Sequence, residues 1–130
     1  MAGNSYLLDT NIIAALFKGE KNIADKMDEA TDVCIPTIVM GELHYGAQYS
    51  TKVRSNTKNI NRLSVYYKIL NATENTALIY GIIKANLRKK GKPIPENDIW
   101  IAAIAQENEL TLVTRDKHFD EIEGLQIVCW

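Results

Sequence analysis

The chain has 130 residues, of which 46% are hydrophobic and 24% charged, and its formal net charge at pH 7 is −1. This length fits one domain, residues 1–130, and the composition is that of a globular protein, which excludes a disordered or fibrous chain. A net charge near zero argues against a protein that coats nucleic acid through bulk charge, so any nucleic-acid contact is expected at a local patch around a specific site.

Three further features narrow the class of protein. The longest uninterrupted apolar run, residues 99–105, is far shorter than the ~20 residues that cross a bilayer, so no membrane association is expected. Residues 1–5 lack the basic residue and apolar core of a secretory signal, which indicates a cytoplasmic protein. Cys34 and Cys129 are too few for a disulfide framework and lie in apolar runs, so both are expected to be buried free thiols without a catalytic role.

The chain begins with a predicted strand over residues 6–8, and Asp9 stands at its carboxyl end. Thr10 and Asn11 are good helix caps and apolar residues follow at helical spacing, so a helix is expected directly after Asp9. Open α/β sheets place their ligands at the carboxyl ends of strands, which makes Asp9 a candidate site residue. The alternative role for Asp9 is that of a helix cap.

The next elements alternate between helix and strand. A second helix is predicted over residues 22–30 and a short buried strand over 32–35. Pro36 suits the first turn of a helix that runs to about Tyr49, and residues 51–67 have the apolar stripe of a surface helix.

The second half of the chain repeats this alternation. A third strand is predicted over residues 69–72 and a long helix from Thr73 to the basic run 88–90, where positive charge is favoured by the helix dipole. Prolines mark residues 92–97 as a loop, and an apolar helix is predicted over 98–106.

The last elements are a fourth strand over residues 110–113, a short helical turn over 116–121 and a fifth strand over 126–129. Strands that alternate with helices predict a mostly parallel sheet covered on both faces, which is a three-layer α/β/α fold.

Two acidic residues occupy helix faces where a free charge is unexpected. Glu42 shares its predicted face with Val39 and Tyr45, and Asp98 shares its face with Ile101 and Ala105. Burying a lone carboxylate is costly unless a cation or hydrogen-bond donors contact it. For Glu42, a role in a functional site is therefore as well supported as a structural role. For Asp98 the structural alternative is stabilisation of the helix dipole.

Asp116 follows the fourth strand directly, as Asp9 follows the first, and its alternative role is that of a turn or cap residue. If Asp9, Glu42, Asp98 and Asp116 converge, unit charges ~4 Å apart repel by about 4 kcal/mol at an effective dielectric near 20, so a cation is required. Oxygen ligands favour Mg²⁺, with Mn²⁺ as a possible substitute, whereas zinc would require suitably spaced histidines or cysteines.

The two histidines do not have that spacing. His44 lies two residues from Glu42 and therefore faces elsewhere on its helix, and His118 has no partner histidine. Both are interpreted as structural or surface residues, and a substrate contact is the alternative for His118.

With these residues in place, the chain resembles a PIN-domain ribonuclease, specifically the VapC-like toxin of a type II toxin–antitoxin pair. The resemblance covers essentially the whole chain and rests on the order and spacing of short motifs. These are Leu8, Asp9, Thr10 and Asn11, then Pro36, Thr37, Glu42, Leu43 and Gly46, then Ile94 to Asp98 with Ile101, Ala102 and Ala103, and finally Leu112 to Asp116 with His118, Phe119, Gly124 and Leu125. All four acidic positions of the family's site are filled.

The resemblance implies a central five-stranded parallel sheet in the order 3-2-1-4-5, with Cys34 and Cys129 on opposite sides of the first strand. It implies endonucleolytic cleavage of RNA, often in tRNA or rRNA loops, and a homodimeric protein. It also implies an antitoxin partner whose C-terminal segment lies over the site and places a basic side chain among the carboxylates.

The hypothesis for the reaction is hydrolysis by a water activated at one or two Mg²⁺ ions, which leaves 5′-phosphate and 3′-hydroxyl ends. Asp9 and Asp98 are expected to be the main ligands, with Glu42 completing the shell or orienting the water and Asp116 as an outer or second-metal ligand. Supporting polar contacts are expected from Thr10, Asn11, Asn97 and Thr114, and RNA contacts from Arg115. Residues Arg88, Lys89, Lys90 and Lys92 are more simply a solvated helix end.

Two other classes of function stay open on the sequence alone. An aspartate-based, Mg²⁺-dependent phosphotransfer module, receiver-like or phosphatase-like, also has an aspartate after its first strand. However, the phosphatase pattern expects a second aspartate where Asn11 stands, and the predicted third strand ends at Asn71 and Ala72 without an aspartate. A catalytically silent RNA- or protein-binding domain is the second alternative, and the four acids argue against it.

Overall fold

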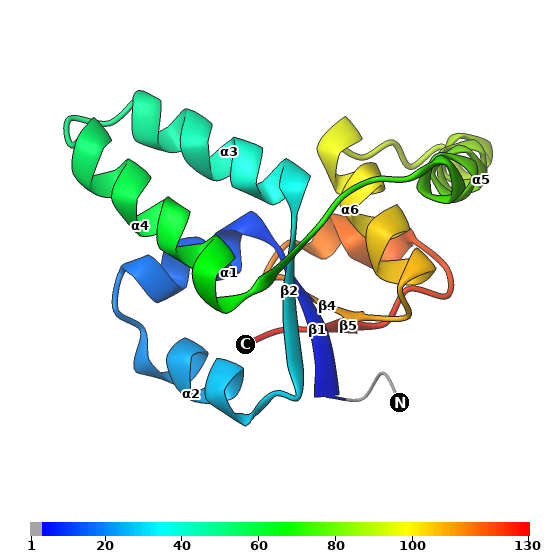
Figure 1. Cartoon of the computed structure of the whole chain (residues 1–130). Coiled ribbons are helices and arrows are strands. Elements are labelled where there is room, and N and C mark those ends of the chain that lie inside the picture. Colours follow the sequence, from blue (N-terminus) through cyan, green and yellow to red (C-terminus); the bar gives the residue numbers. More distant parts are fainter. Residues whose placement is uncertain (1–3) are drawn as a thin grey trace.

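The structure is a computed structural model that describes residues 4–130. The expectation that residues 1–5 are not a secretory signal falls partly on residues 1–3, which lie outside the described part. Its strands all pair in parallel in one sheet of order β3-β2-β1-β4-β5, with helices around the sheet (Figure 1). The strands are β1 (Ser5–Leu8), β2 (Asp32–Pro36), β3 (Lys68–Leu70), β4 (Thr111–Val113) and β5 (Ile127–Val128). The predicted α/β class and strand order are confirmed.

The helices follow the predicted alternation. They are α1 (Thr10–Phe17), α2 (Lys21–Glu29), α3 (Thr37–Gln48), α4 (Val53–Tyr66), α5 (Glu74–Lys90) and α6 (Glu96–Glu107), with a 3₁₀ helix η2 (Lys117–Glu121) between the last two strands. Within residues 4–130 no helix is long and apolar enough to cross a membrane.

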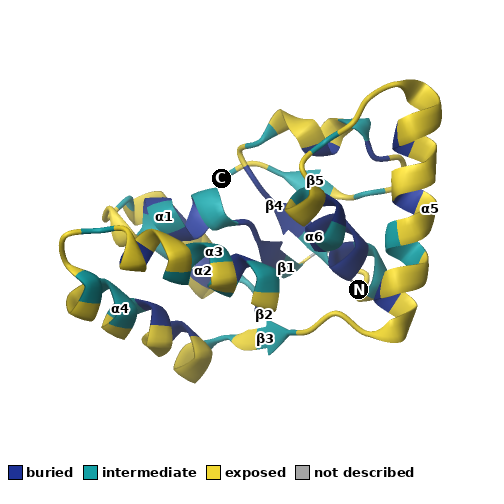
Figure 2. Ribbon diagram, turned by 90° about the horizontal axis from the view of Figure 1, so that it is seen from above, coloured by how far each residue is buried: buried dark blue, intermediate teal, exposed yellow. Residues whose placement is uncertain are grey.

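Strand β1 lies at the centre of the sheet, between β2 and β4, and Leu7 pairs with Cys34 on one side and Leu112 on the other. Leu7 and Leu8 are fully buried because helices cover the central strands (Figure 2). Since β1 and β4 are parallel neighbours, the residues that follow them emerge at the same edge of the sheet. The backbone N–H of Asp9 donates to the carbonyl of Val113 (3.0 Å) and fixes this alignment.

Helix α6 carries much of the core, because Ile99 and all residues from Ile101 to Ala105 are buried. The helix begins at Glu96, two residues before the predicted start, with Pro95 in extended conformation as its N-cap. Asp98 therefore lies in the first turn of α6, where the helix dipole favours a carboxylate.

Two details of the sequence-based predictions need correction. Cys34 is buried in β2 as expected, but Cys129 is exposed, because β5 is an edge strand that ends at Val128 and leaves the next side chain uncovered. Strand β3 ends at Leu70, two residues earlier than predicted, and is followed by Asn71. Both cysteines are free thiols.

The basic end of α5 has the predicted structural role. Gly91 closes the helix in the left-handed conformation (φ 67°), which a residue without Cβ adopts at no steric cost. The ammonium group of Lys90 donates to the carbonyl of Glu121 (2.6 Å), so the helix end also holds η2 in place.

Candidate active site

The four predicted acids come from four separate segments. Asp9 follows β1, Glu42 lies in the middle of α3, Asp98 is in the first turn of α6, and Asp116 follows β4 as the N-cap of η2. Asp9, Asp116 and Glu42 each act on Asp98 through their charge and raise its pKa, so the fold brings the four carboxylates within electrostatic reach of one another.

Asp98 has the most strongly altered acid–base behaviour. The pKa of Asp98 is raised to about 6, mainly by burial, since only 13% of the side chain is exposed, and in part by the charges of Asp9, Asp116 and Glu42, in that order. The charge of His118 acts in the opposite direction. Acids that converge without a cation are expected to raise one another's pKa in this way.

Asp9 is the most buried of the four acids, with 5% of the residue exposed. Its carboxylate accepts hydrogen bonds from the hydroxyl of Thr114 (2.7 Å), the backbone N–H of Thr10 (2.8 Å) and the side-chain amide of Asn11 (3.3 Å). Burial raises the pKa of Asp9 in spite of the Thr114 and Thr10 bonds, and the charges of Glu42 and Asp116 add to this rise. Asp9 therefore caps α1 and also faces the other acids.

Glu42 is tied to the same cluster by one bond, in which the hydroxyl of Thr10 donates to its carboxylate (2.7 Å). The apolar face predicted for Glu42 is only partly buried, since Val39 is fully buried but Tyr45 is 70% exposed. Glu42 lies at the margin of the core, where its side chain can reach α1 and the site.

A polar network behind the acids joins the ends of β1 and β4. The hydroxyl of Thr114 also accepts the backbone N–H of Asp116 (3.0 Å), and the side-chain oxygen of Asn11 accepts the backbone N–H of Arg115 (3.2 Å). Thr10, Asn11 and Thr114, predicted as supporting residues, therefore contact the acids or their backbone directly.

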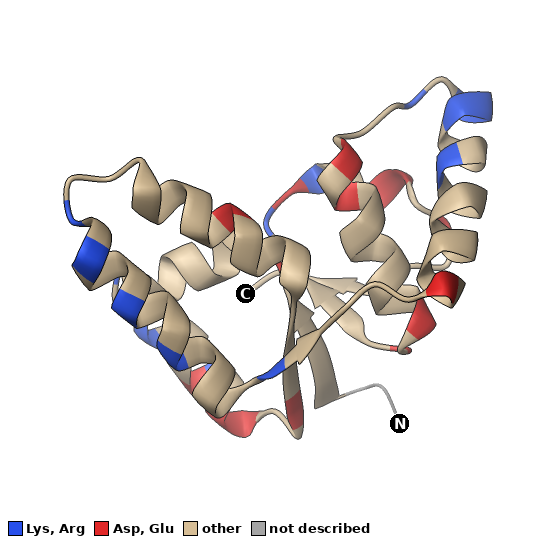
Figure 3. Ribbon diagram, turned by 45° about the horizontal axis from the view of Figure 1, so that its top comes forward, with Lys and Arg blue, Asp and Glu red and all other residues tan. Residues whose placement is uncertain are grey.

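The other two predicted supporting residues are placed differently. The guanidinium of Arg115 donates to the carboxylate of Glu20 (2.8 Å) and to the carbonyl of Trp130 (3.1 Å), so only the backbone of Arg115 takes part in the network. Asn97 is exposed on α6 next to Asp98. In the ribbon of Figure 3, lysine and arginine positions recur along α4 and at the end of α5. Arg115 and Lys117 also flank Asp116 in the chain.

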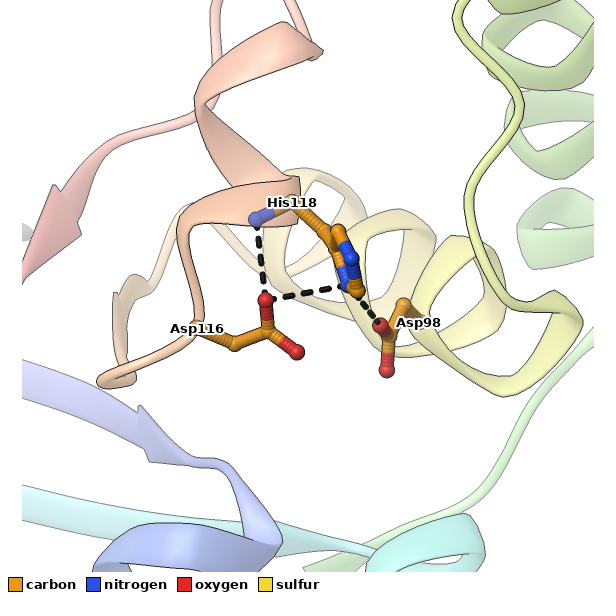
Figure 4. Close-up of side chains that lie close together, drawn as sticks. All are labelled: Asp98, Asp116 and His118. Atoms are coloured by element: carbon orange, nitrogen blue, oxygen red, sulfur yellow. Dashed lines mark hydrogen bonds and ion pairs between the residues drawn. The ribbon is translucent and has the colours of Figure 1, made fainter.

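His118 lies at the site, which its interpretation as a structural or surface residue did not anticipate. Its Nδ1 is 3.0 Å from a carboxylate oxygen of Asp116 and 3.6 Å from one of Asp98 (Figure 4). The sequence signal was the spacing Asp-x-His: an aspartate whose side chain accepts the backbone N–H two residues on, here at 2.9 Å, brings that residue beside its own carboxylate.

A hollow of about 410 Å³ opens beside this part of the site. It is lined by Asp116 and His118 and by the basic residues Lys92 and Lys117. An extended anionic chain has room there next to the acids, with positive charge at the margin.

The donor set fits a divalent cation. In the described part of the chain, Asp98, Asp116 and His118 offer one ligand atom each within 4.8 Å of one another, and Asp9 and Glu42 add carboxylates that couple electrostatically to Asp98. Carboxylate oxygens with at most one imidazole are typical of Mg²⁺ and Mn²⁺ sites.

Comparison with known proteins places the chain among nucleases. The family model for the PIN domain matches residues 6–125. Ribonuclease VapC2 of Haemophilus influenzae is 35% identical over 128 residues, which cover 96% of this chain and 97% of the relative, and the tRNA(fMet)-specific endonuclease VapC of Salmonella typhimurium is 30% identical with the same coverage. The crystal structure of VapBC2 from Rickettsia felis, bound to a DNA fragment from its promoter, matches with a TM-score of 0.90 at 28% identity over 96% of this chain and 98% of that one.

Proposed function

The chain belongs to the PIN-domain family and resembles VapC ribonucleases of that family over nearly its whole length. We propose that it is a metal-dependent endoribonuclease and the toxin of a toxin–antitoxin pair. Its reaction is the hydrolysis of phosphodiester bonds in RNA.

One observation carries the proposal: the charges of Asp9, Asp116 and Glu42 all act on the partly buried carboxyl of Asp98. Within residues 4–130, no lysine or arginine forms an ion pair with these four carboxylates. Carboxylates held this close are unfavourable in the free protein and become favourable when a divalent cation binds. A purely structural cluster would be expected to include compensating cations.

The residues have distinct roles in this proposal. Asp9 and Asp98 are the main ligands, and Glu42 and Asp116 complete the set. A divalent cation bound there supplies a nucleophilic water at neutral pH and neutralises charge on the phosphate.

The surrounding polar residues hold those ligands in place. Thr114 and Asn11 fix the Asp9 carboxylate, and Thr10 fixes that of Glu42, so the set is arranged before the ion and the RNA arrive. Preorganised ligands lose little flexibility on binding, which favours the reactive arrangement.

The name of one relative supports the proposed substrate class. The Salmonella relative is named for tRNA(fMet), so structured loops of tRNA or rRNA are the proposed targets of this chain as well. An antitoxin that covers the acids with a basic side chain is the proposed protein partner, and a homodimer in the cytoplasm is the proposed working form.

The proposal is tested by incubating the purified protein with total RNA in Mg²⁺ or in EDTA, beside Asp98→Asn and the control Asp120→Asn, which changes an exposed acid of η2. We expect the wild type and the control to cleave RNA in Mg²⁺ and to leave 5′-phosphate ends. We expect no cleavage in EDTA and none by Asp98→Asn. Cleavage that survives both EDTA and Asp98→Asn, or products with 2′,3′-cyclic phosphates, would overturn it.

A further inference from the structure

Within the described residues, His118 is the one histidine that lies among the acids, and its ring lies beside the carboxylates of Asp98 and Asp116 (Figure 4). We infer that His118 is a nitrogen ligand of the divalent cation and makes this site favour Mn²⁺, or a similar transition-metal ion, over Mg²⁺. This inference rests on the proposed function, because it takes a metal bound by the carboxylates as given.

The spacing of the donor atoms matches neighbouring ligands around one ion. Ligands at about 2.1 Å from an ion lie about 3.0 Å apart when they occupy adjacent octahedral positions. Nδ1 of His118 lies 3.0 Å from the Asp116 carboxylate and 3.6 Å from that of Asp98. The imidazole thus reaches the shared centre with small side-chain adjustments.

The backbone keeps His118 at this position independently of any ion. Its N–H donates to Asp116 (2.9 Å), and the next residue, Phe119, is fully buried and anchors η2 in the core. The His118 side chain itself is 54% exposed, so replacing it removes a ligand without opening a cavity.

The consequence for metal choice follows from ligand chemistry. Mg²⁺ is a hard cation that prefers oxygen ligands, whereas imidazole suits transition metals, whose affinity for such ligands rises along the series from Mn²⁺. Adding the His118 imidazole to the carboxylates therefore strengthens the binding of Mn²⁺, with little gain for Mg²⁺. The competing arrangement is a simple ion pair of His118 with the two carboxylates, in which Nδ1 keeps its proton and the imidazole leaves the shell when the ion binds.

The test measures metal binding and not RNA cleavage. The chain has two histidines, so protein labelled with ¹⁵N only in histidine allows pulsed electron paramagnetic resonance of bound Mn²⁺ to identify a coordinated imidazole. His118→Gln is compared with the matched control His44→Gln on α3, and calorimetry gives the Mn²⁺ and Mg²⁺ affinities of each.

Histidine nitrogen coupled to Mn²⁺ is expected in the wild type and in His44→Gln and is expected to be lost in His118→Gln. The Mn²⁺ affinity of His118→Gln should fall about tenfold, and its Mg²⁺ affinity should change less than about twofold. Mn²⁺ bound to the wild type without histidine coupling, or an unchanged affinity ratio in His118→Gln, would overturn the inference and leave the carboxylate site intact. Failure of the wild type to bind either ion would overturn both the inference and the proposed function.

Discussion

The hydroxyl of Thr114 donates to the carboxylate of Asp9 at 2.7 Å, although the two residues are 105 positions apart in the chain. This bond joins the residue after β4 to the residue after β1, at the edge where the two central strands end. It supplies a donor to a buried charge and fixes the direction in which that charge points.

Thr114→Val removes this donor with little change of shape. Because a hydrogen bond to a charged, buried group contributes about 1.5 to 3 kcal/mol, the free energy of unfolding should fall by about that amount near neutral pH, and Mn²⁺ affinity should fall about tenfold. Urea denaturation and calorimetry measure the two effects. The control is Thr111→Val at the start of β4, whose hydroxyl contacts Gln126 at 3.3 Å at the surface. It should change stability by less than about 0.5 kcal/mol. Equal effects of the two variants would contradict the role given to Thr114.

The raised pKa of Asp98 predicts an unusual pH dependence of stability without metal. The pKa is 3.8 in the free residue and about 6 in the folded chain, so between these values the folded state binds more protons than the unfolded state. The contribution of Asp98 to stability is therefore full below pH 4 and is lost as the pH rises through about 6. Near pH 7 the ionised form should cost about 1 to 2 kcal/mol after solvent screening.

Asp98→Asn removes that cost. In EDTA, the variant should be more stable than the wild type by about 1 to 2 kcal/mol near pH 7, and the difference should shrink toward pH 4. Chemical denaturation at both pH values gives the difference, with Asp120→Asn as a variant that should follow the wild type. If Asp98→Asn is less stable than the wild type near pH 7, the carboxyl is not under the predicted electrostatic strain.

Thr10→Val tests the tie between α1 and Glu42. Loss of the 2.7 Å bond releases the Glu42 carboxylate, so RNA cleavage in Mg²⁺ should slow about tenfold while stability changes by about 1 kcal/mol or less. Thr37→Val is the matched control, because Thr37 also occupies the first position of a helix and its hydroxyl donates to the carbonyl of Leu70. Cleavage rates that are the same in both variants would remove Thr10 from the site.

For Arg115, the structure and the sequence lead to different predictions, because the sequence analysis expected this residue to contact RNA. Its guanidinium is already paired with Glu20, and this hydrogen bond lowers the pKa of the Glu20 carboxyl. Because exposed ion pairs contribute little to stability, Arg115→Gln should change stability only slightly and leave the salt dependence of RNA binding unchanged. A smaller salt slope in the variant would instead assign the guanidinium to an RNA phosphate.

Much of the fold was predictable because its signals are local. Three features each predict a single structure from neighbouring residues alone. They are the buried strand before Asp9, the helix end at the glycine after the basic residues of α5, and the apolar helix α6. Element ends were less predictable, since the prolines before Glu96 favoured a loop while the helix uses Pro95 as its N-cap. The exposure of Cys129 depends on β5 being an edge strand, which an apolar run alone does not specify.

The acids were predictable from their positions at strand ends and on apolar helix faces, but their partners were not. The place of His118 depends on a turn closed by Asp116. The sequence led only to a structural or surface role for this residue, with a substrate contact as the alternative. The pair between Arg115 and Glu20 joins residues 95 positions apart, so no local pattern could indicate it. Such contacts arise from tertiary packing, and the type of a residue and its neighbours in the sequence do not predict them.

The most direct test of the central claim is anomalous X-ray diffraction from crystals of the protein grown with Mn²⁺. The account predicts an anomalous peak coordinated by Asp9 and Asp98, with Glu42 and Asp116 around it, and no such peak in crystals of Asp98→Asn. Well-ordered carboxylates with no bound ion at saturating Mn²⁺, or a peak elsewhere in the chain, would contradict it.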